Sequence, residues 1–321
     1  MLGRKVTPPR VFRIAKAGIL PPSFVCAMFC VLLAGCSLSP MARHAAAFCS
    51  ASSLVIDNSE DAYRAANDLR EREQLEASAY SYDSDPHWSP YRDFKPLLTP
   101  EQLGARIKVL DGLKAYAESL VDLTGKPSKE DTAALQGAAT GVGTNLTGLS
   151  GTVSTSFDKA LPTLSSAEAK FVSTAMVALG EYLENRKIKN SLPKVTQDMN
   201  KNVQTLCTLL KGDVTVLRRQ ADVDYTTLIE QQNQLLQHNK DKLDAVEKRN
   251  EVETLIRVAY QQKANDRLLA QLQDAIEKLA LTHQALAAAA QGNNPEALKE
   301  KIAVLSDAGK SLSSFYKSLP R

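Results

Sequence analysis

Glycines and one serine near the middle of the chain are the residues whose types and spacing come nearest to known catalytic motifs. Gly143 and Gly148 have the glycine spacing of a phosphate-binding loop. Leu149 and Ser150 follow them, where that motif needs a lysine and then a hydroxyl residue. Gly151 directly follows Ser150, whereas a nucleophile elbow needs one residue between them. The sequence therefore contains neither a phosphate loop nor a nucleophile elbow.

The histidines form no metal-binding pattern. His87 has no second histidine or cysteine at ligand spacing, and His238 and His283 lie outside any HExxH-type array. We expect surface or packing roles for these side chains, and we expect neither a metal nor a cofactor. An enzyme whose site is assembled from distant residues stays open as an alternative, because one sequence does not show which acids and bases meet in space.

The first element of the chain is typical of a leader peptide. Five basic residues and no acidic residue precede Cys36. An apolar run over residues 24–33 follows and small residues close it, which is the order typical of a secretory signal peptide. The run is shorter than the roughly 20 residues that span a bilayer, and Pro21-Pro22 blocks its extension. We expect residues 1–35 to be removed.

The end of this leader, Leu33-Ala34-Gly35-Cys36, resembles the lipobox of bacterial lipoproteins. The resemblance implies cleavage between Gly35 and Cys36, a diacylglycerol on the Cys36 thiol, and a further acyl chain such as palmitate on the new amino group. Several chains anchor a protein far more firmly than the marginal binding of one. In the enterobacterial lipoproteins, a residue other than aspartate at the place of Ser37 favours the outer membrane, which implies a body facing the periplasm.

The composition of the chain after the leader argues against a nucleic-acid partner. The whole chain of 321 residues has a formal net charge of +3. Residues 36–321 contain 34 basic and 36 acidic residues, a net charge of −2. Such a chain lacks the basic surplus on which binding to nucleic acid or anionic lipid depends. Aromatic residues make up only 6%, and the abundance of alanine, leucine, glutamine, lysine and glutamate favours helices.

Two cysteines remain besides Cys36 and those of the leader. Cys49 and Cys207 form an even pair in an oxidising compartment, so a disulfide between them is one alternative. That bond would fasten the N-terminal segment to the long helical part. The other alternative is two separate buried thiols that never meet.

The rest of the chain divides into a tether and one domain. We expect residues 36–58 to form a lipidated tether and residues 59–321 a single α-helical domain. Asn58 or Ser59 can cap the first helix, and its apolar face extends to about Ser78.

An aromatic and proline-rich segment interrupts the helical pattern over residues 80–98. Loops of this length without secondary structure are uncommon in compact domains and are often functional. We expect an irregular strap that lays its aromatic side chains across the bundle. The alternative is an interaction surface made by Trp88, Tyr91 and Phe94.

Two capping boxes mark helix starts after this segment. Thr99 with Gln102 begins a helix that ends before Gly125, and Ser165 with Glu168 begins another. The glycine-rich residues 128–157 between them allow two interpretations. One is a helix whose small residues permit close packing, and the other is a pliable segment that enters lipid or rearranges.

The last third of the chain has the strongest helical pattern. No glycine or proline occurs between Gly212 and Gly292, and apolar residues keep a heptad-like spacing on both sides of the polar residues 237–251. We expect a long antiparallel coiled-coil-like hairpin over about residues 195–291, followed by a C-terminal helix over about residues 295–317. One long helix stabilised by self-association is the alternative.

The expected fold is therefore all-α, an elongated helical bundle with a long hairpin. On the analogy of other helix-rich lipoproteins, we expect a non-enzymatic scaffold or adaptor in the bacterial envelope that binds a protein partner. A membrane-active, pore-forming-like protein that uses the glycine-rich segment is the alternative from a different class.

Overall fold

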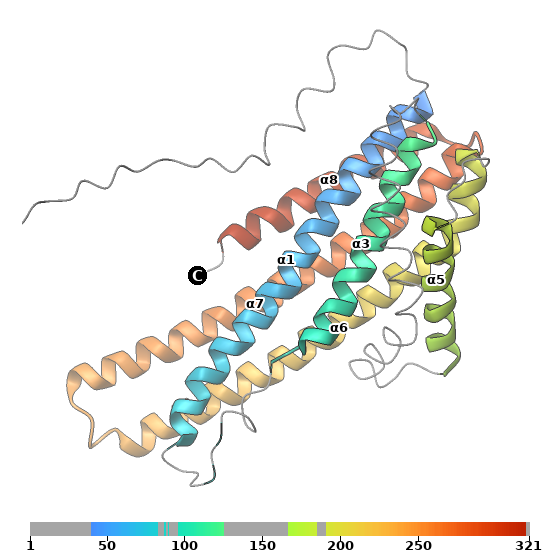
Figure 1. Ribbon diagram of the computed structural model, residues 1–321. Coiled ribbons are helices and arrows are strands. Elements are labelled where there is room, and N and C mark those ends of the chain that lie inside the picture. The colour runs from blue at the N-terminus through green and yellow to red at the C-terminus, as the bar shows by residue number, and fades with distance from the viewer. Residues whose placement is uncertain are drawn as a thin grey trace, which may run out of the picture. The chain divides into compact units, whose positions relative to one another are not determined.

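A computed structural model describes residues 40–82, 87, 89, 96–124, 166–184 and 191–318. The prediction of an all-α fold is confirmed for these residues, and Leu38–Arg321 forms one compact unit. Figure 1 shows the helices of this unit packed lengthwise. The helices are α1 (Pro40–Tyr82), α3 (Pro100–Asp122), α5 (Ser166–Glu184), α6 (Leu192–Asn239), α7 (Ala245–Ala290) and α8 (Pro295–Ser318).

The two longest helices, α6 and α7, run antiparallel along each other (Figure 1). Polar pairs join them at intervals: Lys211 Nζ lies 2.7 Å from Glu277 Oε2, and Gln262 Nε2 lies 2.8 Å from Asp222 Oδ1. The chain folds back at residues 240–244 and does not continue as one helix. This turn lies inside the polar stretch of residues 237–251.

A capping box at the start of α7 explains where the turn ends. The side chain of Asp244 accepts hydrogen bonds from the backbone N–H groups of Val246 and Glu247, over 2.7 and 2.8 Å. Glu247 in return accepts from the backbone N–H of Asp244 over 2.8 Å. These contacts satisfy donors that the first turn of a helix otherwise leaves unpaired.

The other helices pack around this pair. α1 packs against α3, α7 and α8, while α5 packs against α6 and α3. α1 runs in the same direction as α6, because Tyr63 contacts Asp213 and Arg70 contacts Asp224 further along both helices. The start of α1 therefore lies at the end of the bundle opposite the 240–244 turn. We call the part of the α6–α7 pair from Ala221 to Asn265, which includes this turn, the far end.

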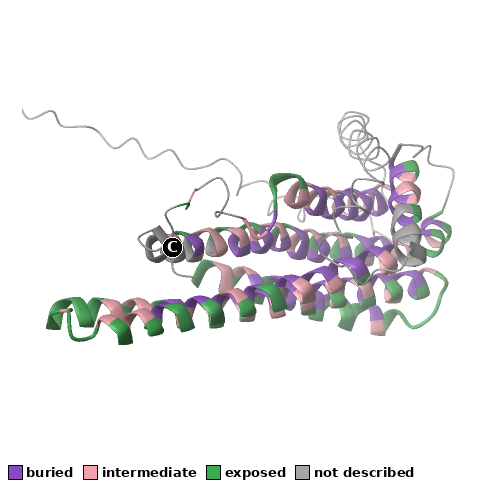
Figure 2. Ribbon diagram, turned by 90° about the horizontal axis from the view of Figure 1, so that it is seen from below, coloured by how far each residue is buried: buried purple, intermediate pink, exposed green. Residues whose placement is uncertain are grey.

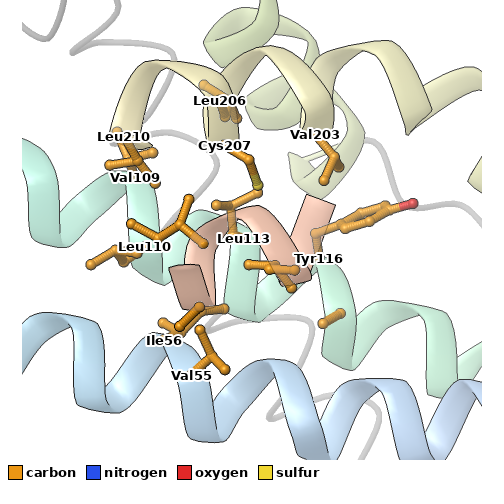
Figure 3. Packing of buried hydrophobic residues seen from close by; sticks show 14 of the residues in the cluster. Val55, Ile56, Val109, Leu110, Leu113, Tyr116, Val203, Leu206, Cys207 and Leu210 are labelled. Carbon is orange, nitrogen blue, oxygen red and sulfur yellow. The ribbon is translucent and has the colours of Figure 1, made fainter. Parts of the chain in front are cut away.

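A continuous apolar core fills the space between the helices. Figure 3 shows side chains from α1, α3 and α6 meeting in it, among them Ile56, Leu113 and Leu206. All three are at most 3% exposed. The apolar repeat that the sequence shows in each of these helices is the face that meets this core.

The start of α1 corrects the predicted tether. Residues 40–58 belong to helix α1, so the prediction of a tether over residues 36–58 is wrong for this part. Asn58 and Ser59 do not cap a helix there, because each donates its side chain to a carbonyl four residues earlier, inside the helix. The alanine-rich sequence explains the difference: alanine has the highest helix propensity, and Phe48 and Val55 supply a face that the core buries.

Two other predicted helices agree with the structure. Thr99 caps α3, and both hydrogen bonds of its capping box with Gln102 are present. α8 begins at Pro295 and buries Leu298, Leu305 and Leu312 on one face, as expected. Ser165 lies outside the described residues, so its predicted capping role is not seen.

Candidate interaction surface

Two polar clusters lie inside the bundle, and the first joins α1, α3 and α6. Arg106 Nε donates to Asp213 Oδ2 over 2.7 Å, and Arg106 Nη2 donates to Asp213 Oδ1. Tyr63 donates its hydroxyl to Asp213 Oδ2 over 3.1 Å. Burial raises the pKa of Asp213, and the Arg106 guanidinium and the Tyr63 hydroxyl oppose this rise. Since neither charged side chain is exposed, the cluster fixes three helices relative to one another and does not face a ligand.

The second buried cluster surrounds His283 on α7. Its Nδ1 atom lies 3.0 Å from Asn200 Oδ1, and its Nε2 atom lies 2.9 Å from the Tyr116 hydroxyl. An amide oxygen only accepts, so Nδ1 holds the proton and Tyr116 donates to Nε2. Burial lowers the pKa of His283 to about 3, which keeps the ring neutral. Both ring nitrogens are thus engaged, and His283 has the packing role that the sequence favours.

A third group of charges lies where α1 meets α3. Lys114 Nζ donates to Asp57 Oδ1 over 2.7 Å, and Glu60 and Asp111 share a hydrogen bond. Burial raises the pKa of Glu60 to about 7, and the carboxylates of Asp111 and Asp57 add to the rise. Arg64 and Lys114 act in the opposite direction. The group is a protonation-sensitive contact between two helices.

The interior of the far end is more polar than the main core. A small separate apolar cluster holds it together, made of Ala221, Tyr225, Leu228 and Val258 with Ile229 packed against them. Gln232 is 2% exposed, and both polar atoms of its amide are buried without a hydrogen-bond partner. Gln261 and Asn265 are buried nearby on α7. The far end therefore has less apolar packing per turn of helix than the rest of the pair.

The outer face of α7 at the far end exposes large apolar side chains. Val252 is 43% exposed, Ile256 50% and Tyr260 68%. These residues are four apart, so they follow one another along one face of the helix, opposite the buried Val258 and Gln261. Figure 2 shows exposed residues gathered at this end of the pair. We call Val252, Ile256 and Tyr260 the α7 stripe.

Exposed apolar residues are concentrated in this part of the chain. Eight large apolar side chains are exposed among the described residues, and four of them lie within residues 246–260 of α7. Single exposed apolar residues need no explanation, whereas a group on one helix face is a candidate interaction surface. The α7 stripe is therefore the strongest candidate site in the described part of the chain.

Basic residues flank the α7 stripe on the same helix face. Lys248 and Arg249 precede it by three or four residues, and Lys263 follows it by three. All three are exposed. Arg249 Nε lies 2.7 Å from Glu253 Oε1, so this acid offsets one of the three positive charges.

Only some of the site residues predicted from the sequence lie among the described residues. The lipid attachment residue Cys36, the cleavage residue Gly35, and the aromatic residues Trp88, Tyr91 and Phe94 lie outside the described residues. Cys49 on α1 and Cys207 on α6 are free thiols, so the structure corresponds to the alternative of two separate thiols and not to a disulfide. Burial raises the pKa of Cys49 to about 11 and that of Cys207 to about 12.

Cys207 illustrates why the two thiols stay apart. Figure 3 shows its side chain, from α6, directed towards Leu110 and Leu113 of α3. Cys49 instead lies near Glu118 of α3, whose charge contributes to its raised pKa. Each thiol packs against a different part of α3.

The described residues offer few features of a metal, membrane-spanning or small-molecule site. They contain no group of three or more histidine, cysteine or acidic side chains that would hold a metal. No helix among them is both long enough and apolar enough to cross a membrane. An open hollow of about 550 Å³ beside the start of α8 is lined by Asn294, Glu296, Ala297, Lys299, Glu300 and Ala303. Most of these residues are exposed, so the hollow lacks the enclosed apolar walls of a small-molecule site.

No protein family, curated protein or solved structure matches this chain.

Sequence reasoning missed the α7 stripe and both buried clusters. The signals were present: Asp213 lies in the apolar repeat between Leu210 and Leu217, and His283 lies between Leu279 and Leu286. A polar residue inside an apolar repeat is buried with a partner, although the sequence does not name that partner.

Proposed function

We propose that this protein is a lipid-anchored adaptor or scaffold of the bacterial envelope, attached through Cys36 and without enzymatic activity. It presents the far end of the α6–α7 pair, which we propose to be a coiled-coil-like hairpin, to a protein partner. The anchor would lie in the outer membrane with the helical body in the periplasm. The observation that favours this proposal is the α7 stripe, an apolar helix face that the described part of the chain leaves exposed.

The order of the chain supports this arrangement. Cys36 precedes the start of α1 by four residues, so an anchor there leads directly into the bundle at the end opposite the 240–244 turn. From Ile256 to the end of α7 at Ala290 the rise is roughly 50 Å at about 1.5 Å per residue. A chain tethered at Cys36 can thus present the α7 stripe at a distance from its point of attachment.

The buried clusters also fit a scaffold. The Arg106–Asp213 pair and the His283 cluster are enclosed by side chains and bonded to other residues of this chain. Such internal contacts suit a rigid spacer. The membrane-active alternative rests on the glycine-rich residues 128–157, which lie outside the described residues.

Two measurements on living cells test the proposal. Labelling with radioactive palmitate should mark the full chain and the Cys49→Ala control but not Cys36→Ala. Chemical crosslinking followed by detergent extraction and mass spectrometry should then recover one recurring envelope protein with the full chain, and less of it with Cys36→Ala. Equal labelling of Cys36→Ala would refute the anchor, and the absence of any recurring partner would refute the adaptor.

A further inference from the structure

We propose that the α7 stripe binds an acidic amphipathic helix of the partner protein. This inference rests on the proposed adaptor function and specifies the chemistry of the partner.

The spacing of the α7 stripe favours a helix as the partner. Val252, Ile256 and Tyr260 span eight residues, or roughly 12 Å at about 1.5 Å per residue. Apolar side chains repeating every three or four residues on a second helix would meet this row along about two turns. The large apolar and aromatic side chains are of the kind that anchor protein interfaces.

The charges around the α7 stripe define the flanks of that helix. Lys248 and Arg249 lie beyond one end of the stripe and Lys263 beyond the other, and all three are exposed. Glu253 is paired with Arg249, which leaves a positive surplus on this face. A partner with glutamate or aspartate beside its apolar row would gain favourable contacts at both ends, whereas lysine there would be repelled.

The same charges argue against a second copy of this chain. If two α7 stripes paired antiparallel about Ile256, Lys263 of each copy would lie opposite Lys248 and Arg249 of the other. A parallel pairing would place each of these cations opposite its own counterpart. Both arrangements bring like charges together, which disfavours self-association through this face.

A lipid surface fits less well than a helix. The turn next to the stripe exposes Asp241, Asp244 and Glu247 beside the cations Lys240 and Lys242. It therefore adds no basic surplus of the kind that attracts anionic lipids. A membrane-bound helix also needs a broad apolar face, whereas the exposed apolar residues here form a single row.

A binding experiment tests the inference with a defined probe. The full chain is placed in nanodiscs of zwitterionic lipid, and empty nanodiscs measure any partition of the peptide into lipid. The probe is a fluorescent peptide of about 20 residues, long enough to be helical, with leucine every three or four residues and glutamate on both flanks. Its twin has lysine in place of every glutamate. Fluorescence anisotropy reports binding at low and at raised salt.

We expect the glutamate peptide to bind at least about tenfold more tightly than the lysine peptide, and to weaken several-fold in raised salt because the flanking charges are exposed. The double change Ile256→Ser and Tyr260→Ser should weaken it at least about tenfold, since it removes the central apolar anchors. Leu281→Ser is the matched control: Leu281 is 41% exposed on the same helix but outside the stripe, and its change should leave binding intact.

Three results would overturn the inference. They are equal binding of the two peptides, binding that Ile256→Ser with Tyr260→Ser leaves unchanged, and recruitment of anionic vesicles or a second copy through these residues in place of the peptide. The adaptor proposal fails separately. If cellular crosslinking finds an envelope partner that these two changes do not affect, the adaptor stands and this inference is wrong.

Discussion

The residues that hold the bundle together are polar groups enclosed among apolar helices. The Arg106–Asp213 pair lost its hydration on folding, and contact between the two side chains compensates for part of this loss. The Tyr63 hydroxyl also donates to Asp213, and Arg106 also donates to the Gln102 carbonyl. His283 remains neutral because burial disfavours its charged form, and both of its ring nitrogens are hydrogen-bonded. Both arrangements make stability depend on particular partners.

Removing one member of the buried ion pair should be far more harmful than removing the whole cluster. Arg106→Met leaves the Asp213 carboxylate buried without its cation, and the free energy of unfolding should fall by about 3–5 kcal/mol. The matched triple change Arg106→Met, Asp213→Leu and Tyr63→Phe leaves no uncompensated charge and should recover most of this loss. Urea unfolding followed by circular dichroism measures both. A triple variant as unstable as Arg106→Met would contradict the prediction.

The neutral His283 should make the protein sensitive to acid. Its pKa of about 3 in the folded chain lies below the ordinary value of about 6.5, so the unfolded chain binds the proton more readily. The contribution of His283 to the free energy of unfolding is therefore fully present above about pH 6.5. It should fall as the pH drops towards 3, by up to about 1.4 kcal/mol per pH unit.

A comparison of two histidine variants separates the effect of His283 from that of other titrating groups. Glu60 acts in the opposite sense between about pH 4.5 and 7, because its raised pKa makes the folded chain bind the proton more readily there. His283→Gln should lower the slope of unfolding free energy against pH below 6.5. His238→Gln, on the exposed end of α6, is the control. If both variants keep the slope of the original chain, His283 does not titrate as described.

At the level of elements, the contact between α1 and α8 depends on a glycine. A methyl group added to Gly309 of α8 would lie 2.9 Å from Leu54 Cγ and 3.2 Å from Val55 Cγ2 of α1. Asn58 Nδ2 also donates to the Gly309 carbonyl over 3.3 Å. The absence of a side chain lets the two helices approach closely.

This close approach should reverse the usual effect of replacing glycine by alanine in a helix. Gly309→Ala should lower the free energy of unfolding by about 1–3 kcal/mol, because the added methyl overpacks the interface. Gly212→Ala in α6 is the matched control, since no atom lies within 4 Å of the added methyl. It should gain about 0.5–1 kcal/mol from helix propensity. If thermal unfolding showed that Gly309→Ala is stabilising, the prediction would be wrong, because α1 and α8 would then move apart at little cost to accept the methyl group.

In the polar interior of the far end, we expect a substitution to stabilise the protein. Gln232 buries an amide with no hydrogen-bond partner, so Gln232→Leu should raise the free energy of unfolding by about 1–2 kcal/mol. Gln262→Leu is the control, because the amide of Gln262 is bonded to Asp222 and Thr226 and its loss should not stabilise. Hydrogen exchange should show the gain in the far-end amides. Destabilisation by Gln232→Leu would mean that its amide has a partner.

The helices that the sequence predicts well are those with local signals. The Thr99 capping box and the polar residues between α6 and α7 act over a few residues, so they are visible in one sequence. The start of α1 is different, because an alanine-rich stretch suits either a tether or a buried helix until Phe48 and Val55 meet the core. Tertiary contact decides between the two.

The candidate site was less accessible to sequence analysis than the fold. On α7 the apolar residues form both an inner and an outer row, and the sequence does not show which row the bundle covers. Val258 is buried whereas Ile256 is exposed, although both are β-branched and two residues apart. Only the positions of the neighbouring helices distinguish core from surface.

At the scale of the whole molecule, the proposed anchor precedes α1, and α1 starts at the end of the bundle opposite the α7 stripe. The sequence leads from Cys36 directly into α1, and the bundle then extends to the 240–244 turn, beside which the stripe is exposed. This is the arrangement that the proposed anchored adaptor needs, because one end would be attached and the other would be available to a partner.

Site-specific photocrosslinking in living cells tests this claim most directly. A photoactivated amino acid is placed at position 256 of the full chain, and at position 281 of the same helix in the matched control. We predict that one recurring envelope protein is captured from position 256, little from position 281, and less from position 256 when Cys36→Ala removes the anchor. The same capture from both positions, or capture unchanged by Cys36→Ala, would contradict an anchored adaptor that binds through its far end.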